Sequence, residues 1–321
     1  MKALPYTPEL APAWNAFVRT SRNGTFLLDR NFMDYHSDRF KDGSLLFYTA
    51  NDQLTAVLPA NLKPEQKLVQ SHGGLTYGGL LLSQTATLTD VRGAFVAAAE
   101  HYAAQGYERL AYKPVPAIYH TYPAEEDLYW LFRAQAVLTE RTVSSTILLN
   151  SPLAQALWHR KTKKKACEGL TLETGNATLL RDFWAIVDDV LSSRHHTHPV
   201  HTLAEISLLS RRFPDSIRLF TATDQGRVVA GCLAFITETT FHVQYMEAGD
   251  EGRRRRALDW LMARLIGLAR DAGLRFLDFG ISTEDGGRFL NEGLAYQKEG
   301  FGGRAICYDT YEAEIPKLMT L

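Results

Sequence analysis

The chain has 321 residues, 45% of them hydrophobic and 22% charged, a composition that excludes disordered, collagen-like and coiled-coil proteins. The formal net charge is −1, so the whole molecule is not attracted to DNA or to an anionic membrane. Three scattered cysteines without a CxxC pair argue against a disulfide framework or structural zinc and favour a reducing compartment. Because we find no secretory signal and no long apolar run, we expect a cytoplasmic protein without a membrane span.

The first half, residues 1–150, reads as a mixture of helices and short strands. Leu10, Trp14 and Phe17 recur at helical spacing within residues 8–21. The other expected elements are strands at 45–52, 53–62, 67–72, 109–119 and 142–150 and helices at 89–105 and 125–136.

The second half, residues 151–321, has its best-supported helix at 254–271. Leucines at 258, 261, 265 and 268 form one stripe, and Gly273 follows as a stop. A strand on each side of this helix, at 239–248 and 275–281, predicts a parallel pair. The other expected elements are helices at 152–168, 177–193, 202–212 and 285–296 and strands at 170–174, 217–223, 227–236 and, as a pair, 301–313.

Four arginines, 253–256, stand immediately before the best-supported helix. A helix dipole favours anions at its N-terminus, so a solvated run of cations would be better placed elsewhere. Free backbone N–H groups beside several guanidinium groups suit a phosphate. The alternative is that the neighbouring acids Asp250, Glu251 and Asp259 pair with these charges.

A second basic segment, HRKTKKKA at 159–166, falls in the expected helix at 152–168. Its five lysines and arginines cannot share one helix face, so some of them only face water. Two or three of them could contact the phosphates of a nucleotide, a CoA-like donor or an RNA end.

Four of the ten histidines fall within residues 195–201. Pro199 breaks the helical spacing that metal-binding histidines would use, and no cysteine or carboxylate pair stands in register, so we expect no metal site. We expect this segment to line a polar substrate pocket through His198 and His201. Helix capping and packing is the plainer alternative.

Polar residues gather after the strand at 275–281. Ligands commonly bind at the carboxyl ends of parallel strands, which places Asp278, Ser282 and Glu284 beside a cleft, with Asn291 shortly after.

Lys298 stands alone among apolar and glycine neighbours. An ammonium there could stabilise a developing oxyanion, and the glycines at 300, 302 and 303 permit a close approach of backbone. The alternative is an ordinary surface lysine.

The strand at 239–248 carries two rows of side chains. Strict alternation places His242 and Gln244 on one face and Phe241, Val243 and Tyr245 on the other. One row is expected to face the cleft.

These segments resemble the GNAT acetyltransferase fold and, within that superfamily, its FemAB-like branch, which includes peptidoglycan-bridge aminoacyltransferases. The resemblance rests on LWHRKTKKKACEGLTLETG, on ALDWLMARLIGLARDAGLRFLDFG and on the closing YQKEGFGGR. The segment WNAFVRTSRNGTFLLDRNFMDYHSDRF is similar to the N-terminal half of such proteins, so nearly the whole chain is covered. The resemblance implies an α/β (α+β) fold of two tandem GNAT-like units, 1–150 and 151–321, each a mixed central sheet flanked by helices.

The same resemblance implies N-acyl transfer to a primary amine, with acyl-CoA as a co-substrate and no bound cofactor. In GNAT enzymes the helix after the fourth strand begins with Q/R-x-x-G-x-G/A, whose backbone amides hold the CoA pyrophosphate. The matching stretch is 252–257, with Arg255 where the pattern has glycine, so that its side chain crowds the pyrophosphate. The residues implied at this donor site are Arg253, Arg254, Arg255, Arg256 and Ala257.

The expected reaction is attack by an amine on an activated acyl carbon. Lys298, which the resemblance places at the reaction centre, would stabilise the oxyanion together with backbone N–H groups near 300–303. His242, Glu284 or a histidine of residues 195–201 would take the proton. The expected substrate contacts are His198, His201, Tyr245, Asp278, Ser282 and Asn291.

Two rival functions remain open. An aminoacyltransferase that uses charged tRNA often carries a long helical hairpin, for which residues 151–215 are too short and interrupted, so acyl-CoA is favoured over tRNA. A binding protein that kept the fold and lost the chemistry would explain the missing glycine. The expected partners are a small acyl donor and an amine acceptor, without DNA, and the family links such proteins to cell-envelope biogenesis.

Overall fold

The structure is a computed structural model that describes residues 1–152, 167–175, 177–195 and 198–321. The chain forms two compact units. Unit 1 contains 1–142, 285–288 and 307–321, and unit 2 contains 143–284 and 289–306. Two strands run from one unit into the other, β9 (Val137–Leu148) and β17 (Arg304–Glu314).

Unit 1 contains two sets of strands with helices packed on them. One set is antiparallel, in the order β1-β3-β4-β7. The other runs β17-β8-β6-β5-β2, with β6 and β8 parallel. The strands are β1 (Lys2–Pro5), β2 (Lys41–Asp42), β3 (Leu45–Tyr48), β4 (Leu54–Leu58), β5 (Asn61–Lys63), β6 (Leu68–Gln70), β7 (Leu81–Leu82) and β8 (Arg109–Tyr112), and the helices are α1 (Ala11–Thr20), α2 (Arg30–Met33), α3 (Leu88–Ala103), α4 (Glu126–Arg133) and α11 (Ile315–Met319).

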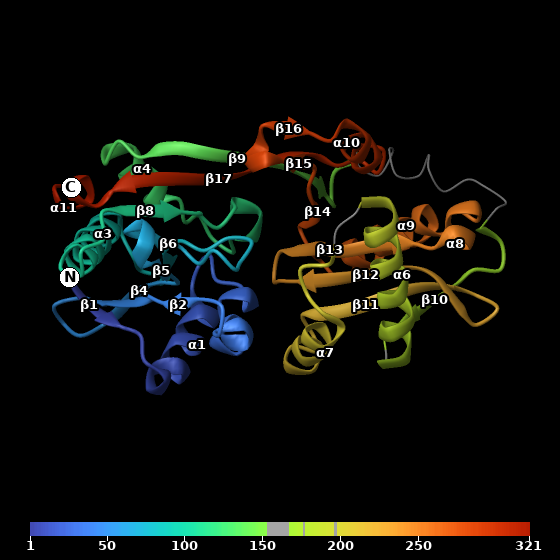
Figure 1. The fold of residues 1–321 in the computed structure, drawn as a ribbon, viewed down its shortest axis with the longest axis horizontal. Helices are drawn as coiled ribbons and strands as arrows, with labels where there is room; N and C mark the ends of the chain where they lie inside the picture. Colours follow the sequence, from blue (N-terminus) through green and yellow to red (C-terminus); the bar gives the residue numbers. More distant parts are fainter. Residues whose placement is uncertain (153–166, 176, 196–197) are drawn as a thin grey trace. The chain divides into compact units, whose positions relative to one another are not determined.

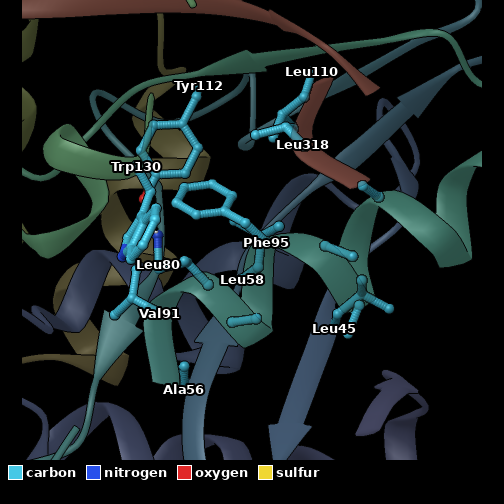
Figure 2. Close-up of a cluster of buried hydrophobic side chains, with 14 of the residues drawn as sticks. Leu45, Ala56, Leu58, Leu80, Val91, Phe95, Leu110, Tyr112, Trp130 and Leu318 are labelled. Atoms are coloured by element: carbon cyan, nitrogen blue, oxygen red, sulfur yellow. Dashed lines mark hydrogen bonds between the residues drawn. The ribbon is translucent and has the colours of Figure 1, made fainter. Parts of the chain in front are cut away.

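The core of unit 1 forms around α3, which begins with a capping box between Thr87 and Asp90. Phe95 of α3 packs beside Tyr112 of β8 and near Leu318 of α11 (Figure 2). The C-terminal helix α11 is therefore part of the hydrophobic core of unit 1.

Unit 2 is built on a mixed sheet in the order β10-β11-β12-β13-β14-β9. The predicted parallel pair is confirmed, since β13 and β14 run parallel across the connecting helix, while the other neighbours are antiparallel. The predicted fold class, mixed sheets flanked by helices, is confirmed. The strands are β10 (Thr171–Thr174), β11 (Ile217–Asp224), β12 (Arg227–Ile236), β13 (Thr240–Ala248) and β14 (Phe276–Ile281).

Helices cover both faces of this sheet (Figure 1). Leu261 and Leu265 of α9 (Ala257–Asp271) pack with Cys232 and Phe241 on one face. On the other face lies α6 (Ala177–His195), so close that a Cβ on Gly231 would come within 2.3 Å of the Phe183 ring. The remaining helices of this unit are α7 (Leu203–Arg212), α8 (Asp250–Arg254) and α10 (Glu292–Glu299).

The structure corrects three expected elements. The helix expected at 254–271 begins only at 257, as α9, because Arg256 has a left-handed backbone with φ +53° and separates it from the short helix α8. The helix expected at 285–296 begins only at 292, where the Asn291 side chain caps it, and the preceding residues form the hairpin of β15 (Thr283–Glu284) and β16 (Phe289–Leu290). The strand pair expected at 301–313 is the single strand β17.

No helix among the described residues combines the length and the apolar character needed to cross a bilayer.

Candidate active site

The candidate site lies in unit 2, where β13 and β14 separate. Their ladder contains three registered pairs and ends at His242 and Asp278. Beyond that point a cleft of about 520 Å³ lies beside residues 246–248 of β13. Its other walls are the α8–α9 corner, with Gly252, Arg253 and Arg256, and helix α10, with Asn291, Leu294 and Gln297.

A bulge in β13 changes which side chains share a face. Two neighbouring residues of β12 pair with Val243 and Tyr245, so Gln244 is an extra residue. Because the extra residue resets the alternation, Tyr245 lies on the face of His242 and opposite Val243. The prediction that Tyr245 and His242 face opposite sides is wrong, since strict alternation holds only in a strand without a bulge.

Asp278 is the centre of a buried polar row across three strands. Its Oδ2 lies 2.7 Å from Nδ1 of His242 on β13. Its Oδ1 accepts hydrogen bonds from the hydroxyls of Ser144, at 2.5 Å, and Thr146, at 2.6 Å, both on β9. Burial alone would raise the pKa of Asp278, but the hydrogen bonds from His242 and the two hydroxyls outweigh it and lower that pKa. The carboxylate is therefore ionised and directed at protein groups.

Lys298, on the last turn of α10, is 3% exposed, which excludes the surface-lysine alternative. Its Nζ donates hydrogen bonds to the carbonyl oxygens of Gly280, at 2.9 Å, and Ile281, at 2.7 Å. Burial lowers the pKa of Lys298 to about 8, against the opposing attraction of Asp278. The ammonium thus ties the end of α10 to the end of β14.

Every arginine of the run 253–256 has a carboxylate partner. Their partners are, in order, Asp250, Glu251, Asp224 and Asp259. Charge pairing, the alternative for this run, is therefore present at each position, and Asp224 is a partner from a distant strand.

The four arginines differ in their access to the cleft. Arg253 and Arg256 line it, whereas Arg254 and Arg255 do not, and Ala257 is fully buried. Arg255 also hydrogen-bonds the backbone carbonyl of Glu168, and the predicted crowding of a pyrophosphate by its side chain stays a prediction. The basic segment 159–166 lies outside the described residues.

The polar residues that follow β14 lie in three different environments: the cleft, the exposed surface and the buried interior. Asn291 lines the cleft and caps α10 by accepting a hydrogen bond from the Leu294 N–H at 3.1 Å. Glu284 is exposed and lies 3.4 Å from the Asn291 amide nitrogen. Ser282 is buried, and its hydroxyl has no hydrogen-bond partner in the described part of the chain.

The histidine segment contributes one buried member. His201 Nδ1 lies 2.9 Å from the Tyr245 hydroxyl, and the Tyr245 ring meets Trp184 edge-on. Burial raises the pKa of Tyr245. His198 is exposed, and His196 lies outside the described residues. The contacts of His201 fit the packing alternative, and the structure brings it to Tyr245 without His198.

Sequence reasoning missed Ser144 and Thr146, the two hydroxyl donors to Asp278. A signal was present, because two hydroxyl residues at i and i+2 share one face of a strand. Their partner could not be identified, since the β9–β14 pairing joins segments 132 or more residues apart.

A second cavity of about 400 Å³ lies between β11 and α7, and none of the predicted site residues lines it. Within the described ranges no group of three or more His, Cys, Asp or Glu side chains is placed to hold a metal ion.

Part of the sequence matches a known family, and the whole fold is similar to solved structures. Residues 158–285 match the family model of the acetyltransferase (GNAT) domain. No curated protein matches the sequence. The fold is similar to the crystal structure of FemX, with a TM-score of 0.67, 11% identity, and 97% of each chain covered. It is also similar to the C-terminal domain of a putative lysylphosphatidylglycerol synthetase from Agrobacterium fabrum, with a TM-score of 0.56, 14% identity, and coverage of 96% of this chain and 91% of that one. A tandem GNAT protein from the clavulanic acid pathway gives a TM-score of 0.54 at 12% identity over 98% of both chains.

Proposed function

We propose that the chain, whose residues 158–285 match the acetyltransferase (GNAT) domain and whose fold is similar to that of FemX, is an acyltransferase that moves an acyl group from acyl-CoA to a primary amine. The acceptor would be a small molecule or a cell-envelope precursor. The observation that carries the proposal is the cleft beside β13, because Arg253 and Arg256 of the basic corner line it and the buried polar row lies on the same strand pair, where the β13–β14 ladder ends.

The cleft suits an extended donor. Beyond the end of the β13–β14 ladder, the edge of β13 presents backbone N–H and C=O groups that β14 does not pair with. The amide-containing arm of CoA can form hydrogen bonds with such an edge. The α9 start and the guanidinium groups of Arg253 and Arg256 stand at the outer end, where pyrophosphate would bind. An ion pair uses at most two of the five N–H donors of a guanidinium, so both arginines keep donors for phosphate oxygens.

The reacting end would lie at the vertex of the cleft, near His242 and Lys298. The amine nitrogen attacks the acyl carbon, a C–N bond forms, and the C–S bond to CoA breaks. His242 accepts the proton that the amine loses, and the departing thiolate takes up a proton. Lys298 and backbone N–H groups stabilise the oxyanion of the tetrahedral intermediate. Glu284, the other proposed base, is the more exposed of the two.

Donor binding is the first test. Wild-type protein is heated with CoA, acetyl-CoA, longer acyl-CoAs or UDP-sugars, and a ligand at about 100 times its Kd should stabilise the fold by about 2.7 kcal/mol. Arg253→Ala should weaken acyl-CoA binding roughly 10- to 100-fold, because a hydrogen bond to a charged group contributes about 1.5–3 kcal/mol.

Arg270→Ala is the matched control. Arg270 also pairs with a carboxylate, Asp271, but at the far end of α9, so its removal should leave donor binding unchanged. Equal losses in both variants would contradict a phosphate role for Arg253. If no acyl-CoA binds, charged tRNA becomes the donor to test, and failure with every donor would favour a non-catalytic binding protein.

A further inference from the structure

Asp278 is buried at 0% exposure, and every contact described for it is with a protein group, which is unsuited to binding a substrate. We infer that Asp278, held by Ser144 and Thr146, is a positioning residue that keeps the His242 proton on Nδ1 and so leaves Nε2 as the base for the acceptor amine. This inference rests on the proposed function, because it assigns His242 its task.

The tautomer follows from the chemistry of the partners. An ionised carboxylate only accepts hydrogen bonds, so the Nδ1 that lies 2.7 Å from Asp278 Oδ2 must carry the proton. Both hydroxyls from β9 donate to the other oxygen, Oδ1, which leaves Oδ2 to His242. The neutral imidazole then presents its lone pair on Nε2.

The sheet fixes the geometry of this row. Asp278 is registered directly opposite His242 on one side and Thr146 on the other, so three adjacent strands hold the interacting side chains. The ladder ends at this register and the bulge at Gln244 follows, so His242 is the last residue of β13 that β14 holds in place. The base is thus held in place at the end of the β13–β14 ladder.

Two titratable groups of the described residues act on the dyad or on its neighbours. Lys298 of α10 acts on Asp278 through its charge. His201, before α7, contacts the ring of Phe235, which is the registered neighbour of His242 on β12. Lys298 and His201 are both present in the wild type and in the variants described next, so their effect on His242 is the same in the proteins that are compared.

The tautomer can be measured without any turnover. In protein labelled with ¹⁵N-histidine, His242, assigned by its loss in His242→Gln, should show a protonated Nδ1 and an unprotonated Nε2. In Asp278→Asn the amide oxygen can keep the two hydroxyl donors while the NH₂ group faces His242, which should move the proton to Nε2. A protonated Nε2 in the wild type, or the same tautomer in both proteins, would overturn the inference even if acyl transfer is confirmed.

Kinetics gives a second readout. Asp278→Asn should lower kcat by roughly 10²- to 10⁴-fold with little change in KM, since general-base catalysis contributes about that much. Ser144→Ala and Thr146→Val, which remove one hydroxyl donor to Asp278 each, should lower kcat by less.

Asp127→Asn is the matched control. Asp127 is also a buried carboxylate, 3% exposed, and it accepts a hydrogen bond from Tyr112 at 2.6 Å in unit 1. Its variant should lose stability without a change in the tautomer or in kcat. Equal effects in both variants would reduce Asp278 to a structural role. If the wild type transfers no acyl group but shows the Nδ1 tautomer, the proposed function fails, whereas the inference that Asp278 orients His242 still holds.

Discussion

At the scale of single residues, Lys298 shows how burial changes an ammonium group. In the folded protein its pKa is about 8, whereas the ordinary value is 10.5. Between these two pH values the unfolded chain binds more protons than the folded one, so stability rises with pH. A neutral amine still has two N–H donors, enough for the carbonyls of Gly280 and Ile281.

Lys298→Met tests this linkage. The wild type should gain up to about 3 kcal/mol over the variant as the pH rises from 7 to 10, measured by urea unfolding of both proteins. This contribution is complete above pH 10.5 and lost as the pH falls through about 8. Ionisable groups that both proteins share contribute equally to their free energies of unfolding, so they do not affect the difference between the two. A stability difference that does not change with pH would show that the lysine is not desolvated.

At the scale of elements, the α8–α9 corner depends on one glycine. A Cβ on Gly252 would lie 2.0 Å from the backbone oxygen of Val229, which cannot move without disturbing β12. Gly252→Ala should therefore cost about 1–3 kcal/mol and displace the corner that lines the cleft. Urea unfolding measures the first effect, and acyl-CoA affinity measures the second.

Gly267→Ala is the control for this prediction. Gly267 is inside α9, and a Cβ there would meet no atom within 4 Å. The same exchange should stabilise the protein by about 0.5–1 kcal/mol, because glycine is a poor helix former. Loss of stability in the Gly267 variant as well would mean that α9 tolerates no added methyl group.

The elements that the sequence predicted well are those with a strong local signal. The leucine stripe of α9 and the strands around it were sufficient to predict the parallel pair. The bulge at Gln244 was not predictable, because its position depends on the register with β12. Asp278 is expected to contact substrate because it lies near the carboxyl end of a parallel strand, and its partners on β9 were not identified because they are far away in the sequence.

At the scale of the whole molecule, segments that are consecutive in the sequence belong to different units. The closing segment, residues 307–321, belongs to unit 1, although residues 289–306 before it belong to unit 2. The segment belongs to unit 1 because β17 pairs with β8, with Tyr311 opposite Tyr112. The order of predicted elements gives no sign of this return.

This membership predicts where a core substitution acts. Leu318 of α11 is 1% exposed and packs in the unit 1 core, so Leu318→Ala should cost about 2–5 kcal/mol. Met319→Ala, at the adjacent position with 41% exposure, should change stability by less than about 0.5 kcal/mol. Hydrogen exchange then locates the effect: the Leu318 variant should lose protection in α3 of unit 1 and keep it in α9 of unit 2. An equal loss in both helices would mean that the two units unfold as one, because only a shared transition transmits a core defect from one hydrophobic core to another.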